Sequence, residues 1–295
     1  MIAAIASGKG GTGKTTVTAS LASVWPDVFS RPVVAVDLDV EEPNLHLFLK
    51  PEIEETRTAR FEVPMADESK CDYCRRCAEL CQFKAINVLG DNLLIFPEMC
   101  HSCGGCLLVC PLDVLSPDFR ELGEISWGQA ETSGFVNGRL RVGEAMSPPL
   151  MRQVKAKVKE LYPEGKEDML IDAPPGVSCP AMNAVKDSEV IVLVTEPTPF
   201  GFHDLKLAWE SFASLDLPMG VVVNRAGQEY EELSAFCEAN SLPILAQVPY
   251  DRKAAEMYAK GHILADISLE FRRIFLELAR NLEELRLSGK GPDHE

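Results

Sequence analysis

The chain has 295 residues, of which 46% are hydrophobic and 25% charged, as is typical of a soluble globular protein with one large domain and a small one. Its 45 acidic residues outnumber its 29 basic residues, which gives a formal net charge of -16. An acidic surface repels nucleic acid and anionic lipid, and no apolar run is long enough to span a bilayer. We therefore expect neither nucleic acid nor a membrane as a partner.

The first predicted strand, Ile2 to Ala6, leads directly into a glycine-rich loop. From Gly8 to Thr15 the loop reads G-K-G-G-T-G-K-T and matches G-x-x-x-x-G-K-[ST], and a helix-compatible run from Thr15 to Trp25 follows it. In such a loop, backbone N–H groups surround phosphate oxygens, Lys14 neutralises the β- and γ-phosphates, and the Thr15 hydroxyl ligates Mg²⁺. We therefore predict an ATP and Mg²⁺ site formed by Gly8, Gly10, Gly11, Thr12, Gly13, Lys14, Thr15 and Thr16.

The second predicted strand, Val33 to Val36, ends at Asp37-Leu38-Asp39. A carboxylate at the C-terminal end of a parallel strand faces the ligand crevice of an α/β sheet. A single aspartate in such a place is often only solvated, but two in succession make Asp37 and Asp39 candidate site residues.

Eight of the ten cysteines form two runs with the same spacing, C-x2-C-x2-C-x3-C. The first strand leaves no room for a signal peptide, so we expect a cytoplasmic protein, in which cysteines bind metals more readily than they form disulfides. The spacing is typical of bacterial two-cluster ferredoxins, where the fourth cysteine of each run binds the other cluster. We predict two [4Fe–4S] clusters, one held by Cys71, Cys74, Cys77 and Cys110 and the other by Cys81, Cys100, Cys103 and Cys106.

The surroundings of the cysteine runs bear on this prediction. Pro111 follows the second run, but Gln82 follows the first, where the ferredoxin pattern usually has proline. Four-cysteine zinc sites are the alternative, although they usually pair two short knuckles. Residues 85–89 and 93–96 flank Gly90-Asp91-Asn92 and predict a short hairpin, which suits a ferredoxin fold.

Four further strands are predicted after the cysteine runs: Met169 to Asp172, Val190 to Val194, Gly220 to Val223 and Pro243 to Val248. They alternate with helical segments, which indicates an α/β fold with a doubly wound, mostly parallel sheet. Candidate site residues follow three of these strands: Asp172 leads into Ala173-Pro174-Pro175-Gly176, Asn224-Arg225 follows Val223, and Pro249 follows Val248. A strand-end Asn is also a good turn or helix N-cap residue.

In chain order, the K-G-G-T-G-K-T loop, the D-L-D segment and the D-A-P-P-G segment resemble the MinD/ParA/Mrp family of P-loop ATPases, with a two-cluster ferredoxin domain inserted. The resemblance implies that Lys9 reaches across an ATP-dependent homodimer to the partner's nucleotide, whereas a solvated lysine is the alternative on loop composition alone. It assigns catalysis to Lys9, Lys14 and Asp39, with Asp39 orienting the attacking water. It also implies a Mg²⁺ site formed by Thr15, Asp37 and Asp172.

The same resemblance implies roles for the later strand ends. Gly176 would sense the γ-phosphate, Asn224 with Arg225 would recognise adenine, and Pro249 would belong to the loop that closes over the base. These three roles come from the resemblance and not from the residues alone.

The order of the motifs predicts the domain organisation. We expect a P-loop ATPase domain at 1–60 and 147–295, interrupted at 61–146 by a small α+β ferredoxin-like domain and a return segment. A last helical pattern, Ser268 to Leu287, has apolar residues at helical spacing but many glutamates on its polar face. Membrane-surface helices favour a basic polar face, so we expect this helix to pack on the core.

These features predict an ATP-hydrolysing switch that dimerises on ATP and couples nucleotide state to electron transfer by two [4Fe–4S] clusters. The partner would be a redox protein or a metalloenzyme. Two alternatives stay open. The first is an iron-sulfur cluster carrier or assembly scaffold of the Mrp type, and the second is a nucleotide-dependent positioning module with little turnover.

Overall fold

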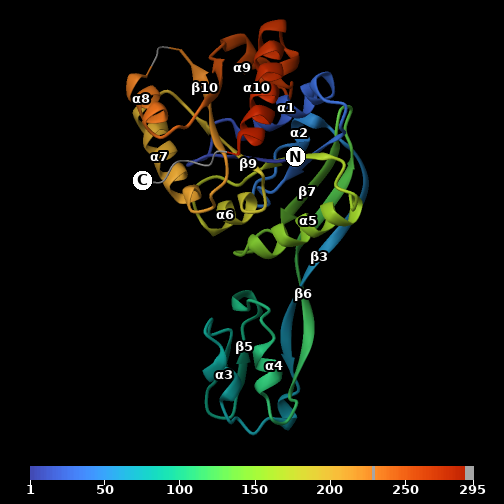
Figure 1. The fold of residues 1–295 in the computed structure, drawn as a ribbon. Coiled ribbons are helices and arrows are strands. Elements are labelled where there is room, and N and C mark those ends of the chain that lie inside the picture. The colour runs from blue at the N-terminus through green and yellow to red at the C-terminus, as the bar shows by residue number, and fades with distance from the viewer. Residues whose placement is uncertain (228–229, 290–295) are drawn as a thin grey trace. The chain divides into compact units, whose positions relative to one another are not determined.

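The computed structural model describes residues 1–227 and 230–289, and Figure 1 shows its elements. The strands are β1 (Ile2–Ala6), β2 (Val33–Asp37), β3 (Glu52–Ala66), β4 (Ile86–Val88), β5 (Leu93–Ile95), β6 (Leu115–Gln129), β7 (Gly134–Leu140), β8 (Asp168–Asp172), β9 (Val190–Thr195), β10 (Met219–Ala226) and β11 (Ile244–Pro249). The helices are α1 (Lys14–Val28), α2 (His46–Leu49), α3 (Arg76–Leu80), α4 (Gly105–Val109), α5 (Pro148–Leu161), α6 (Cys179–Val185), α7 (Pro199–Ala213), α8 (Glu231–Ala239), α9 (Arg252–Tyr258) and α10 (Leu269–Ser288), with 3₁₀ turns at Glu68–Lys70, Pro97–Met99 and Leu264–Asp266.

A nine-stranded sheet has the order β11-β10-β9-β1-β8-β2-β7-β6-β3. Adjacent strands from β11 to β7 pair in parallel, as the alternation of strands and helices predicted. Asp172 on β8 lies in register with Asp37 on β2 and with Ile5 on β1. The register therefore brings the carboxyl ends of three strands to one edge of the sheet, although β8 follows β1 and β2 by more than a hundred residues in sequence.

Both faces of this sheet are covered by helices (Figure 1). On one face, apolar side chains of α1 and α10 form a single core with those of β1, β2, β8 and β9. On the other, α5, α6 and α7 bury residues such as Met151, Ala184 and Phe212. Helix α10 begins at its N-cap Ser268, whose hydroxyl accepts the Phe271 N–H, and buries Phe275 and Leu282 completely. The prediction that the C-terminal helix packs on the core is confirmed.

The chain divides into two compact units. The sheet unit comprises residues 1–56, 125–139 and 151–295, and the cysteine unit comprises 57–124 and 140–150. The predicted insertion, 61–146, lacks residues 57–60 and 147–150 of the cysteine unit, and it wrongly includes 125–139. That segment belongs to the sheet unit because β7 pairs in parallel with β2 from Gly134 to Asn137. Within the described residues, no helix is long and apolar enough to cross a membrane.

The cysteine unit repeats its backbone at an interval of 29 residues, the separation of Cys71 from Cys100. Helix α3 begins at Arg76 and α4 at Gly105, and a 3₁₀ turn precedes each cysteine run. Positive φ angles recur at the same interval, as at Tyr73 (55°) and Ser102 (53°). The predicted hairpin between the runs is present as β4 and β5, which pair antiparallel.

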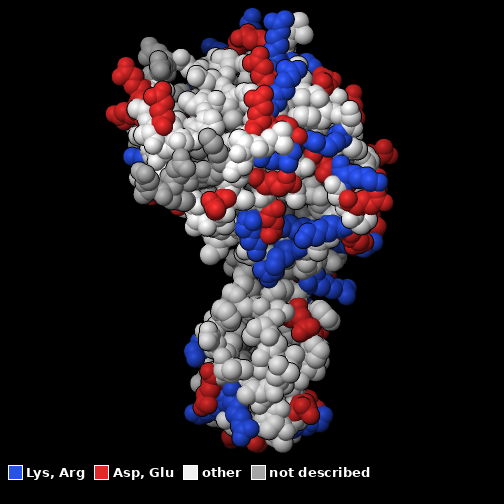
Figure 2. Space-filling model, in the orientation of Figure 1, with Lys and Arg blue, Asp and Glu red and all other residues white. Residues whose placement is uncertain are grey.

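Charged side chains on the sheet unit are mixed in sign, and on the face shown in Figure 2 basic side chains gather where α5 lies. That helix carries Arg152, Lys155, Lys157 and Lys159. The net acidity of the chain is therefore not spread evenly over its surface.

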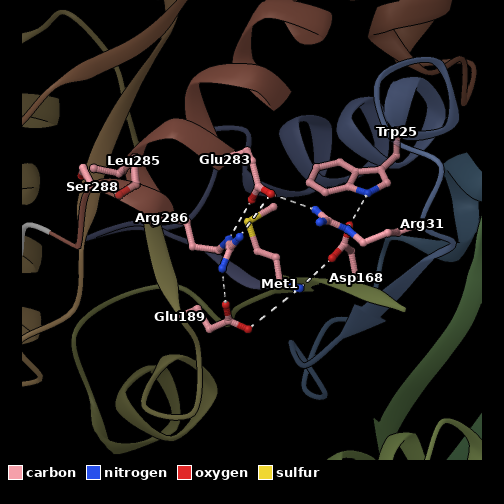
Figure 3. Close-up of polar contacts among 9 residues, drawn as sticks. All are labelled: Met1, Trp25, Arg31, Asp168, Glu189, Glu283, Leu285, Arg286 and Ser288. Carbon is pink, nitrogen blue, oxygen red and sulfur yellow. Dashed lines mark hydrogen bonds and ion pairs between the residues drawn. The ribbon is translucent and has the colours of Figure 1, made fainter. Parts of the chain in front are cut away.

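A buried carboxylate fixes the start of β8 (Figure 3). Asp168 is 1% exposed; its Oδ1 lies 2.6 Å from the Met1 ammonium, and its Oδ2 accepts from Trp25 Nε1 at 3.0 Å and from Arg31 Nε at 2.8 Å. Arg31 also pairs with Glu283 on α10. The carboxylate thus connects β1, α1, β8 and α10, and its charge is compensated by two cations, as a buried charge requires.

Candidate functional site

The glycine-rich loop joins β1 to α1 and is shaped by contacts that exclude side chains. Gly13 has a φ of 102°, and a Cβ on it would lie 2.2 Å from Asn224 Nδ2. A Cβ on Gly8 would lie 2.1 Å from the backbone oxygen of Asp204 on α7. Only glycine fits at these two positions. The loop is therefore held close to β10 and α7 while its backbone N–H groups stay available for phosphate.

Asn224, at the end of β10, supports the loop from behind. Its Nδ2 donates to the Thr12 carbonyl at 2.7 Å, and its Oδ1 accepts the Arg225 N–H at 2.9 Å. The Asn224 side chain is almost completely buried and already uses both ends of its amide. From the sequence, Asn224 was expected to form a turn or to recognise adenine. Its hydrogen bond to Thr12, 212 residues away, has no local signal in the sequence.

Three aspartates and Lys14 lie together beside the loop. Thr15 Oγ1 donates to Asp172 Oδ2 at 2.6 Å, while Asp172 Oδ1 is buried and, among the described residues, has no hydrogen-bond partner. Burial raises the pKa of Asp172 to about 7 and that of Asp39 to about 6. Burial also lowers the pKa of Lys14, and the three carboxylates oppose that shift. An orphaned carboxylate oxygen next to a threonine hydroxyl is a donor set that fits Mg²⁺.

Asp37 has a different environment from the other two aspartates. It is fully buried, and its two oxygens accept the backbone N–H groups of Asp39 (3.1 Å) and Leu45 (3.0 Å). Burial raises its pKa well above the ordinary value, and the neighbouring Asp172 raises it further. Both oxygens of Asp37 therefore organise the turn after β2, and through that turn they position Asp39.

A cavity of about 480 Å³ opens above the loop. It brings together most of the predicted nucleotide residues, and its lining includes Gly10, Gly11, Gly13, Lys14, Thr15, Thr16, Asp39, Asn224, Arg225 and Pro249. The volume lies in the range of small-molecule sites. Gly176 lies outside the lining, and its N–H donates to the Ser7 carbonyl at 3.0 Å.

Other residues of this cavity had no sequence motif to reveal them. Phe48 and Tyr258 stack with ring centroids 4.5 Å apart, and both line it. Tyr250 also lines it and is largely exposed, and Asp251 accepts the Ala254 N–H to begin α9. A cavity lined by aromatic side chains and by a phosphate-binding loop suits a nucleotide.

Lys9 lies on the outer side of the loop. Its Nζ is 3.6 Å from Asp204 Oδ2, and its side chain is 34% exposed. Lys9 does not line the nucleotide cavity. Within one chain, then, this lysine is paired with α7 and turned away from the nucleotide site.

The eight cysteines of the two runs divide between two separate cavities in the cysteine unit. Cys71, Cys74, Cys77 and Cys110, here called site one, line a cavity of about 20 Å³. Cys81, Cys100, Cys103 and Cys106, here called site two, line a cavity of about 380 Å³. In each set, three cysteines of one run meet the fourth of the other.

The structure describes all ten cysteines, and none of them forms a disulfide. Burial raises the pKa of Cys77 and Cys100, and charged neighbours from the same site raise it further: Cys110 and Cys71 for the former, Cys103 and Cys81 for the latter. In the described part of the chain, no group of three or more His, Cys, Asp or Glu side chains is gathered closely enough to hold a single metal ion. The two remaining cysteines, Cys179 and Cys237, belong to neither site.

The sequence is similar to a known protein family and to proteins of other organisms. The sequence model of the CobQ/CobB/MinD/ParA nucleotide binding domain matches residues 3–264. The uncharacterized protein MJ0578 of Methanocaldococcus jannaschii is 30% identical over 283 residues, which cover 95% of this chain and 96% of that protein. An iron-sulfur cluster carrier protein of Aquifex aeolicus is 28% identical over 139 residues, which cover 41% of this chain and 38% of that protein.

The fold resembles that of solved structures. The cell division ATPase MinD of Pyrococcus furiosus superposes with a TM-score of 0.59 at 24% identity, covering 96% of this chain and 98% of that one. The septum site-determining protein MinD of Pyrococcus horikoshii, complexed with Mg-ADP, gives a TM-score of 0.60 at 22% identity, covering 98% of both chains. At these identities the likeness concerns the fold, a mostly parallel α/β sheet of the P-loop type.

Proposed function

Because the chain belongs to the CobQ/CobB/MinD/ParA nucleotide-binding family, we propose that it binds and hydrolyses ATP and couples nucleotide state to electron transfer by two [4Fe–4S] clusters. The observation that carries the proposal is the occurrence, in one chain, of a phosphate-binding loop beside Asp172 and of two four-cysteine cavities. A phosphate-binding loop does not require four-cysteine cavities, and the cavities do not require the loop. Their presence in one chain therefore supports a function that uses both.

In the proposed ATPase reaction, the loop N–H groups and Lys14 bind the β- and γ-phosphates. Thr15 and Asp172 are the residues that would hold Mg²⁺, which supplies charge neutralisation on the phosphates when bound. Asp39 orients the attacking water, and its raised pKa of about 6, caused by burial, places it near the range useful to a general base. Asp37 acts through the backbone of Asp39 and not on the nucleotide.

Dimerisation on ATP is the second part of the proposal. For Lys9 to reach a partner's nucleotide, its ion pair with Asp204 must break. A partly exposed pair of this kind contributes on the order of 1 kcal/mol or less, so the nucleotide phosphates of a second copy could replace it.

Two [4Fe–4S] clusters fit the cysteine unit because each of the two cavities is lined by four thiols, in the crossed arrangement typical of two-cluster ferredoxins. Such clusters supply one-electron chemistry when bound. The backbone repeat supports the same assignment, because it gives both sets of thiols equivalent positions.

A protein partner for the cysteine unit is part of the proposal. The face of this unit shown in Figure 2 carries few charged side chains. Several apolar side chains near the cavities are exposed, including Leu108 at 90%, Phe83 and Leu112. An exposed apolar surface of this kind is typical of a protein interaction site, here for a redox protein or metalloenzyme.

A cluster carrier is the second candidate function, and the similarity to the Aquifex aeolicus iron-sulfur cluster carrier protein favours it. The carrier would transfer a cluster to an acceptor, while the switch would transfer only electrons. Anaerobic mixing of the reconstituted protein with an acceptor protein that lacks its cluster separates the two functions, because iron moves to the acceptor only if the protein is a carrier.

The ATPase activity is tested by phosphate release from the reconstituted protein. Lys14→Ala should abolish turnover, since it removes the cation on the phosphates. Lys186→Ala, at an exposed lysine after α6, is the matched control and should hydrolyse ATP at the rate of the unchanged protein. Equal rates in the Lys14→Ala variant and the unchanged protein would contradict the mechanism.

A further inference from the structure

The two cysteine sites have equivalent backbones but very different cavities. Site one encloses about 20 Å³, whereas site two opens into about 380 Å³ that extends to Pro64 and Phe83. Because the backbone repeats at the same interval in both halves, side chains at equivalent positions contribute to this difference, and Glu62, Val63 and Pro64 of β3 line site two alone.

Two pairs of those side chains are large at site one and small at site two, whereas Asp72 at site one corresponds to the larger His101 at site two. Tyr73 and Arg75 line site one, and the residues that occupy the equivalent positions at site two are Ser102 and Gly104. All four have positive φ, so the backbone is the same in each pair. A Cβ added to Gly104 would meet nothing within 4 Å, which shows that the wall of site two is open there.

Cys110 and Cys81, each of which completes the site formed by the other run, also differ in how they are held in place. Cys110 completes site one, is followed by Pro111, and accepts the Val114 N–H at 3.4 Å. Cys81 completes site two and is followed by Gln82, which lines the larger cavity; among the described residues, no hydrogen bond to its Sγ is found. N–H donors to a ligand sulfur and a rigid following residue hold a ligand in place, and the removal of such support costs about 10–100-fold in metal affinity.

We infer that site two is the exchangeable site of this protein and that site one retains its cluster. The inference rests on the proposed function, because it concerns clusters bound at both sites. A molecule entering the larger cavity can reach the ligand bonds at site two, whereas Tyr73 and Arg75 leave only a small cavity at site one. If a nitrogen or oxygen atom of a chelator replaces a cysteine at iron, the Cys–Fe bond breaks, the chelator–Fe bond forms, and the cysteine thiolate takes up a proton.

The test is the rate of iron loss from the reconstituted full-length chain under anaerobic conditions. An iron(II) chelator is added with dithionite, which supplies the electrons that bring all iron to Fe(II), and the sulfide leaves as hydrogen sulfide with protons from solvent. Half of the iron should leave roughly 10–100-fold faster than the other half. Two equal rates in a chain that holds both clusters would overturn the inference but leave the proposed function standing. A chain that binds no cluster would overturn both.

Reciprocal variants assign the two phases. Ser102→Tyr should slow the fast phase and Tyr73→Ser should accelerate the slow one, and both positions already hold a non-glycine residue at positive φ, so the exchange keeps the backbone. Gln82→Pro should also slow the fast phase. If the fast phase responded to Tyr73→Ser and not to Ser102→Tyr, site one would be the exchangeable site and the inference would be wrong.

Discussion

Asn224 illustrates how one side chain can define a binding loop. The amide donates to the Thr12 carbonyl from inside the protein, and Gly13 must lack a side chain to let it approach. Loop shape and strand β10 are therefore coupled through a single buried hydrogen bond.

Asn224→Ala should weaken ATP binding and lower the free energy of unfolding by about 1–3 kcal/mol, because the Thr12 carbonyl loses its buried donor. ATP titration and urea unfolding measure the two effects. Asn240→Ala is the control: it removes a similar bond, to the Phe236 carbonyl at 2.8 Å, away from the cavity. Asn240→Ala should lose stability without losing ATP affinity. A loss of ATP affinity in both variants would argue against a specific role of Asn224 in supporting the phosphate loop.

Asp172 makes stability depend on pH. The folded protein keeps a proton on Asp172 up to about pH 7, since burial raises its pKa, whereas an unfolded aspartate releases the proton near pH 3.9. Between these values the folded state binds more protons, so its contribution to stability is fully present at low pH and is lost as pH rises towards about 7.

The nucleotide-free protein should therefore lose thermal stability through this group between about pH 4 and about pH 7, and Asp172→Asn should flatten that decline. Thermal unfolding followed by circular dichroism in the presence of EDTA measures it. Asp187→Asn is the matched control, because the pKa of Asp187 is lowered by its hydrogen bond to Lys155 and its loss leaves the decline in place. An unchanged slope in Asp172→Asn would rule out Asp172 as its source.

At the scale of elements, helix α10 and strand β8 are joined through buried charge. Asp168 begins β8 and binds the Met1 ammonium, Trp25 and Arg31, and Arg31 continues to Glu283 on α10 (Figure 3). The network fixes the N-terminal ends of β1 and β8, which are the strands that lead to the phosphate loop and to Asp172.

Asp168→Asn should destabilise the protein by roughly 3–5 kcal/mol, because it leaves two cations without their buried carboxylate. Urea unfolding measures the change. Asp187→Asn breaks the pair of Lys155 with an aspartate side chain that is 55% exposed, and should cost on the order of 1 kcal/mol or less. Similar losses in the two variants would mean that the Asp168 network adds no more stability than a surface pair.

At the scale of the whole molecule, two strands belong to both units. Residues 52–56 of β3 and 125–129 of β6 lie in the sheet unit, and the rest of each strand lies in the cysteine unit. The chain thus passes between the two units within continuous strands as well as at the segments around 139–140 and 150–151.

If nucleotide state is coupled to electron transfer, the reduction potential of at least one cluster should differ between the ATP-bound and ADP-bound protein. Redox titration followed by electron paramagnetic resonance measures both clusters separately. Lys14→Ala should remove the difference without loss of iron. Identical potentials in the two nucleotide states of the unchanged protein would leave the switch without support and favour the carrier.

Features that depend on neighbouring residues could be predicted from the sequence. The glycine-rich loop, the aspartates at strand ends, the 85–96 hairpin and the alternating strands and helices were all predicted, because each depends on residues at short, fixed spacings. These local patterns were sufficient for the fold class and for most of the nucleotide cavity.

Contacts between residues that are far apart in sequence could be found only in the folded structure. The entry of β7 into the large sheet, the Asn224 support of the loop, the buried Asp168 network and the pairing of Lys9 with Asp204 all join residues far apart in sequence. The unequal cavities around two identical cysteine spacings belong to the same class. Their size depends on side chains that face the thiols in space, and a ligand spacing contains no information about the volume around it.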